Sequence, residues 1–208
     1  MNGQYAGEPS RPARASRGTM RAYWVLATII FLGFTAVGAT FPFFSLYATA
    51  LGASLGQVAI VVGVQAAVAV VAGLIWGRGA DLLGRRRPFV IGAMAGLAVV
   101  SLAIASVPTW EWLVPLSALV GLAIGAHQTI SLALMGDILE GHPRRGRLIS
   151  GYRMSGSLAF SVAIVISGWL AETVDPRGSF LLAAGVYGLA LLVSPFITEP
   201  PRAIPVAA

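Results

Sequence analysis

The stretch that decides the fold runs from Ala22 to Gly77 and reads AYWVLATIIFLGFTAVGATFPFFSLYATALGASLGQVAIVVGVQAAVAVVAGLIWG. It contains no charged residue. A transmembrane helix needs about 20 apolar residues to cross about 30 Å of hydrocarbon, so this stretch is long enough for two crossings. The small residues between 50 and 56 are typical of a turn. We therefore predict two membrane-spanning helices, at about residues 22–49 and 56–77.

Four more apolar runs follow, and each is long enough for one further crossing. They cover about residues 88–107, 111–136, 147–171 and 178–198. Of the 208 residues, 57% are hydrophobic and only 11% are charged, whereas about 25% of an ordinary soluble domain is charged. The mean hydropathy of +0.81 points the same way. The sequence thus excludes a soluble domain and predicts an all-α membrane protein with six transmembrane helices, residues 21–198.

The 14 basic residues are all arginine, and they lie almost entirely on one side of the predicted bundle. If successive helices alternate in direction, every arginine except Arg177 falls on the side of the N-terminus. Arginine-rich loops stay in the cytoplasm, so we expect a multi-pass protein of the cell (plasma or inner) membrane with both termini cytoplasmic. This orientation explains the net charge of +6 without nucleic acid as a partner. The polar segments 1–20 and 199–208 are expected to be cytoplasmic tails, the first of them disordered.

The most specific string lies between the second and third predicted helices and reads Gly77-Arg78-Gly79-Ala80-Asp81-Leu82-Leu83-Gly84-Arg85-Arg86-Arg87. Its pattern, G-x-x-x-D-x-x-G-R-R, resembles the signature loop of the major facilitator superfamily of secondary transporters, in sequence and in position. Glycine permits close helix approach at 77 and a sharp turn at 84. The resemblance implies a gating loop that latches two halves of a transporter in one state of its cycle, with Asp81 and Arg85 carrying the latch. The loop residues concerned are Gly77, Asp81, Gly84, Arg85 and Arg86.

Softer likenesses to this family extend over about residues 20–202. Phe41-Pro42 resembles the proline-bearing segment of its first helix, and Gly121-x-x-x-Gly125 is a close-packing pattern in the fourth helix. Gly121 is also a departure, because many proton-coupled members of the family have an arginine at that place. Proton coupling through such an arginine is therefore not expected here.

The resemblance implies one half of a larger fold. Family members usually have twelve helices in two six-helix halves, and each half contains two inverted three-helix repeats. Gly77-x-x-x-Asp81 and Gly168-x-x-x-Glu172, on opposite sides of the membrane, fit such a 3+3 repeat. We expect the chain to pair with a second six-helix half, as a homodimer or with a separate chain. The pair would move a small solute by alternating access, as a permease or efflux protein. The alternative is a truncated relic that transports nothing, or a modulator that binds a full-length transporter.

Three polar side chains are expected near the middle of the membrane, where such a residue is a functional candidate. His127 lies about ten residues, or about 15 Å, from the end of the fourth helix, beside Gln128. Gln65 is similarly central in the second helix. These three form the candidate substrate or proton site, since an imidazole titrates near neutral pH. The alternative is structural, with the imidazole and the amides bonded to neighbouring helices. Weaker candidates are Thr40, Ser45 and Tyr47.

Arg153 is predicted to lie about 9 Å inside the fifth helix, which is deep for a charged group. Asp137 ends the fourth helix near the same side of the membrane. We therefore expect an Asp137–Arg153 ion pair with a gating or structural role.

The sequence contains no pattern typical of an enzyme or of a cofactor site. It lacks a Walker-type phosphate loop, a Ser-His-Asp set and a cluster of metal ligands, and it has no cysteine. We expect no enzymatic activity, no cofactor and no metal. The expected partners are the lipid bilayer, the second six-helix half and a small-molecule solute. Because this half has few polar groups near the middle of the membrane, we expect the solute to be neutral or amphipathic.

Overall fold

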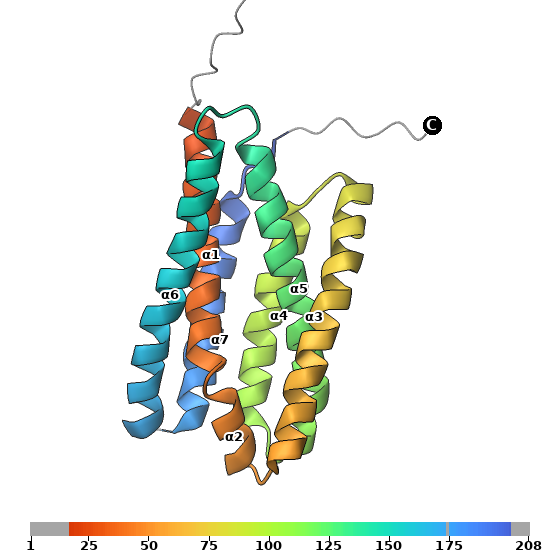
Figure 1. Ribbon diagram of the computed structural model, residues 1–208, viewed down its shortest axis with the longest axis vertical. Helices are drawn as coiled ribbons and strands as arrows, with labels where there is room; N and C mark the ends of the chain where they lie inside the picture. The colour runs from red at the N-terminus through yellow and green to blue at the C-terminus, as the bar shows by residue number, and fades with distance from the viewer. Residues whose placement is uncertain (1–16, 174, 201–208) are drawn as a thin grey trace, which may run out of the picture.

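The computed structural model describes residues 17–173 and 175–200, which form a bundle of long helices (Figure 1). The elements are α1 (Arg17–Thr40), α2 (Phe44–Ala50), α3 (Leu55–Leu83), α4 (Arg87–Ser106), η1 (Trp110–Trp112), α5 (Leu113–Ile138), α6 (Arg145–Thr173), α7 (Pro176–Val193) and η2 (Ser194–Phe196). Taking α1 with α2, η1 with α5 and α7 with η2, the described residues contain six segments long and apolar enough to cross a membrane. The predicted all-α, six-span fold is confirmed.

The helices lie in two rows. One row contains α6, α1, α5 and α3, and the other contains α7 and α4 (Figure 1). The beginning of α1, the α3–α4 loop, the α5–α6 loop and the end of α7 meet at one end of the bundle. This end carries Arg21, Arg85–Arg87 and Arg144–Arg147, and we call it the arginine-rich end.

The packing of the helices repeats itself within the bundle. α1 packs against α6 and α7, α5 packs against α3 and α4, and α4 packs against α7. Exchanging α1 with α5, α3 with α6 and α4 with α7 leaves this set of pairs unchanged. Such an exchange is what two inverted three-helix repeats produce.

Glycines let α3 and α5 touch backbone to backbone. A β-carbon built on Gly125 would lie 2.5 Å from the carbonyl oxygen of Ala69 and 2.9 Å from the amide nitrogen of Gly73. One built on Gly121 would collide with the carbonyl oxygen of Gln65. The predicted packing role of Gly121 and Gly125 is confirmed, and the lack of an arginine at 121 follows because no side chain fits there.

Gly77 does not share this role. A β-carbon there would lie 3.7 Å from the Thr129 methyl group, which is an ordinary contact. The close approach predicted at Gly77 is found one turn earlier, at Gly73, where a β-carbon would lie 3.0 Å from Oγ1 of Thr129.

The first span is broken, whereas the sequence predicted one continuous helix over 22–49. α1 ends at Thr40 and α2 begins at Phe44, because Pro42 has no N–H to continue the helix. Near the break, the carbonyl of Ala39 accepts a hydrogen bond of 2.6 Å from Ser167 in α6. Ser167 also bonds the hydroxyl of Ser179 in α7 at 2.8 Å, so one buried serine ties three helices together.

Two boundaries differ from the predicted ones at the arginine-rich end. α1 begins at Arg17, so residues 17–20 of the expected disordered tail are helical. α3 continues to Leu83, six residues past Gly77, since a helix can extend beyond the hydrocarbon with charged side chains in water. Residues 1–16 and 201–208 of the two predicted tails lie outside the described part of the chain.

Candidate functional site

The signature loop is a tight turn between α3 and α4. Gly84 ends α3 in the left-handed conformation, with φ of 64°, which glycine adopts without strain. Asp81 therefore lies in the last turn of α3 rather than in the loop. The turn leaves Arg85 and Arg86 next to each other between the two helices.

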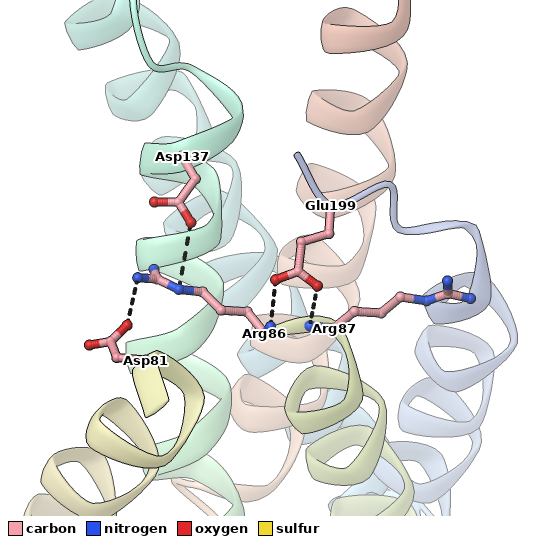
Figure 2. A network of polar contacts seen from close by, with 5 residues as sticks. All are labelled: Asp81, Arg86, Arg87, Asp137 and Glu199. Carbon is pink, nitrogen blue, oxygen red and sulfur yellow. Dashed lines mark hydrogen bonds and ion pairs between the residues drawn. The ribbon is translucent and has the colours of Figure 1, made fainter. Parts of the chain in front are cut away.

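Arg86 is the centre of a charge network at this turn (Figure 2). Its Nη2 donates to Oδ1 of Asp81 at 3.1 Å, and its Nε lies 3.6 Å from Oδ2 of Asp137 at the end of α5. Only 12% of the Arg86 side chain is exposed, against 66% of Asp81. A largely enclosed guanidinium thus connects α3, the turn and α5.

Glu199 completes the network from the other end of the sequence. Its carboxylate accepts the backbone N–H of Arg86 at 2.5 Å and that of Arg87 at 3.3 Å (Figure 2). These N–H groups begin α4 and have no partner within the helix, and the helix dipole also favours a negative charge there. Nη2 of Arg87 donates to the carbonyl of Pro195 at 2.7 Å. Glu199, the first residue of the predicted cytoplasmic tail 199–208, is therefore held against the start of α4.

Two predicted roles change with this geometry. The ion pair that the structure shows for Asp137 is with Arg86, and not with Arg153. Within the described residues, Arg85 makes no ion pair, and the place expected for it is taken by Arg86. Successive residues of a turn point in different directions, so only one of the two arginines can face Asp81 and Asp137.

Arg153 lies in a hollow of about 730 Å³ between α1, α5 and α6, which we call the front hollow. Its polar lining includes Gln128, Thr129 and Ser157, and its apolar lining includes Phe34. All of its lining residues come from three helices of the four-helix row, α1, α5 and α6. Within the described residues no carboxylate lines it, so it combines one positive charge, several hydrogen-bonding groups and an apolar wall.

A second cavity, of about 250 Å³, lies beside the break of the first span. Gln65, Thr40 and Ser45, three of the predicted candidates, all line it. Tyr47, the remaining weaker candidate, is not among the lining residues and donates a hydrogen bond of 2.9 Å to the carbonyl of Ile104. Gln65 and Gln128 are therefore in different spaces.

His127 lines neither space. Its side chain is buried, with Nδ1 3.3 Å from Oγ of Ser131, one turn further along α5. A β-carbon on Gly33 of α1 would lie 2.6 Å from Nε2, so the imidazole packs directly on the α1 backbone. The structure separates the three predicted midplane residues, and the imidazole bonds within α5 rather than to a neighbouring helix, as the structural alternative had it.

The family profile described as Major Facilitator Superfamily matches residues 26–207 of this chain. The chain belongs to the major facilitator superfamily. No curated protein matches the chain. The predicted family is thus confirmed, and the chain contains a transporter-type domain of this superfamily with six membrane-spanning helices.

Two structural features of this major facilitator superfamily domain were not predicted from the sequence. The first is the capping of α4 by Glu199, for which the signal is an acidic residue directly before Pro200 at the end of the last span. The second is Ser167, one of many serines in apolar helices. Nothing in its local sequence distinguishes it from its neighbours, because its partners come from α1 and α7.

Proposed function

We propose that this domain is one half of a secondary transporter that moves a small solute across the cell membrane by alternating access. It pairs with a second six-helix half, which is another copy of the chain or a separate polypeptide. The arginine-rich end faces the cytoplasm, in agreement with the distribution of positive charge. The observation that carries the proposal is the composition of the four-helix row, which combines a polar hollow with two poorly covered apolar helices.

The two outer helices of that row, α3 and α6, lack cover along their length. In an apolar 18-residue stretch of each span, only 17% of the residues are buried in α3 and 22% in α6. In the other four spans the buried share is 39% to 44%. Exposed side chains include Val70 and Leu74 in α3 and Leu158 and Val165 in α6. Helices that flank a polar hollow and present such faces suit contact with a second half across the hollow.

The front hollow is the proposed solute site of this half. Between them, Gln128, Thr129, Arg153 and Ser157 offer hydrogen-bond donors and acceptors, and Phe34 offers an apolar surface. A volume of about 730 Å³ suits a small organic molecule. A polar group in a membrane interior is retained where it binds a solute or a partner helix. We therefore expect an amphipathic solute that uses both linings.

The charge network around Arg86 is the proposed gate. Asp81, Arg86 and Asp137 connect the ends of α3 and α5 at the cytoplasmic side. A solute path that opens to the cytoplasm requires these helix ends to shift relative to their surroundings. Breaking and re-forming the two ion pairs of Arg86 would then bias the equilibrium between the two states.

The test combines the mass of the purified chain in lipid nanodiscs with uptake by proteoliposomes. We expect native mass spectrometry to show a dimer, or a complex with a co-expressed second half, and the same species to catalyse counterflow of a small solute. Arg153→Gln and Gln128→Ala should reduce uptake and leave assembly intact. Arg147→Gln, an exposed arginine outside the front hollow, is the matched control. Assembly without uptake of any solute in a broad panel would favour the non-transporting alternative.

A further inference from the structure

Arg85 lines another hollow at the arginine-rich end, together with Arg21 from α1 and Arg87 from the start of α4. We call this space of about 780 Å³ the basic hollow. Its remaining wall comes from the segment after α7, including Phe196 and Glu199. The basic hollow therefore lies where three spans reach the edge of the membrane.

The charges of the basic hollow are unbalanced. Within the described residues, neither Arg21 nor Arg85 makes an ion pair. The one carboxylate in the lining, that of Glu199, is engaged by the backbone N–H groups at the start of α4. Arg87 is held in place by its hydrogen bond to Pro195. Three guanidinium groups and one carboxylate thus line the space, and positive charge is in excess.

The rest of the lining is apolar. Pro88 and Ile91 on α4 and Phe196 and Ile197 at the end of the last span form this part of the wall. Phe196 is 59% exposed, so its ring is available for contact. A ligand that fits must therefore have a negative head group at the arginines and hydrocarbon that continues along the outside of α4.

We propose that the basic hollow binds the head group of an anionic phospholipid from the cytoplasmic leaflet. The phosphodiester lies between Arg21 and Arg85, and guanidinium groups suit phosphate oxygens because they donate two parallel hydrogen bonds. The acyl chains lie against Ile91 and Phe196. This site is separate from the proposed solute hollow, and it gives Arg85 a role outside the charge network of Arg86.

The test measures lipid retention in nanodiscs of phosphatidylcholine with a minor fraction of phosphatidylglycerol. We expect native mass spectrometry to show one phosphatidylglycerol retained per chain after the bulk lipid is removed. The variant is R21Q/R85Q, and the control R78Q/R147Q removes the same charge from the same end of the bundle. Each arginine near an anionic lipid contributes about fivefold to affinity, so the variant should lose about 25-fold. The control should lose much less, because neither Arg78 nor Arg147 lines the basic hollow.

Three results would overturn the proposal. Equal loss of phosphatidylglycerol in variant and control would show a general surface charge effect. Equal retention of phosphatidylcholine and phosphatidylglycerol by the unmodified chain would show that charge is not recognised. Displacement by soluble glycerol 3-phosphate at low concentration would show a site for a free phosphate rather than for a lipid.

Unfolding temperatures serve as the folding control. Those of the unmodified chain and of both variants in phosphatidylcholine alone should match, because neither Arg21 nor Arg85 makes an ion pair in the described structure.

Discussion

The carboxylate of Glu199 accepts the backbone N–H of Arg86 at 2.5 Å, although the two residues are 113 positions apart in the chain. This hydrogen bond fixes the backbone at the start of α4 and thereby the direction in which the Arg86 side chain leaves the turn. The guanidinium then reaches Asp81 and Asp137. The segment after the last span thus contacts the backbone of the same residue whose side chain forms the centre of the charge network.

Replacing Glu199 should destabilise the bundle. Glu199→Ala leaves two N–H groups at the start of α4 without their acceptor, and loss of a helix N-cap costs about 1 kcal/mol. Unfolding titrations in mixed micelles measure this change in the free energy of unfolding. Glu140→Ala, which removes an exposed acid from the same end of the bundle, is the control. An equal effect of both substitutions would contradict the capping role.

Arg86 and Arg85 should differ sharply when each is changed to alanine. Arg86→Ala leaves the carboxylate of Asp137, whose side chain is only 25% exposed, without its ion pair to Arg86. We expect a loss of about 1–3 kcal/mol in the free energy of unfolding, because the group is partly desolvated. Arg85→Ala should change it by less than about 0.5 kcal/mol in phosphatidylcholine, as for other exposed positions. The reverse order would show that Arg85 carries the network.

A methyl group at Gly125 should separate α3 from α5. Gly125→Ala places a β-carbon against the backbone of Ala69 and Gly73, and such overpacking costs about 1–3 kcal/mol. Gly63→Ala in α3 is the control, since nothing lies within 4 Å of its β-carbon and alanine is the better helix former. Thermal unfolding in nanodiscs should show a lower midpoint for the first and an unchanged or higher one for the second. A tolerated alanine at 125 would refute the close contact.

Ser167→Ala should make the backbone at the break in the first span less well held. It removes the donor to the Ala39 carbonyl and the bond to Ser179, at a cost of about 1 kcal/mol. We expect faster hydrogen exchange around residues 39–44, measured by mass spectrometry. Ser161→Ala, an exposed serine that bonds the carbonyl of Ser157 in its own helix, should leave exchange there unchanged. Similar exchange in both variants would mean that Pro42 alone shapes the break.

The six spans and the contact between α3 and α5 could be predicted from the sequence because both depend on local patterns. Span number follows from the length of apolar runs, and the contact follows from Gly121 and Gly125, one turn apart on one face of the helix. The turn at 51–54 could likewise be predicted, since Gly52 adopts a φ of 91° and Ser54 caps α3.

The pairing of charges could not be predicted in the same way. The sequence places several arginines on the same side of the membrane as Asp137, and the pairing with Arg86 depends on where α3 ends and on how α4 begins. The separation of Gln65 from Gln128 also depends on tertiary packing, because both are central in their helices. Depth in the membrane follows from the sequence, whereas the neighbour at that depth does not.

α4 follows the outer helix α3 and α7 follows the outer helix α6, and the first turns of α4 and α7 are capped in different ways. α7 begins with Asp175, whose Oδ1 accepts the N–H of Arg177 at 2.7 Å within the same short segment. α4 begins with an acceptor supplied by Glu199, after the last span. During synthesis on the ribosome the start of α7 is therefore complete as soon as it emerges. The start of α4 gains its acceptor only after Glu199, which follows the sixth span, has been synthesised.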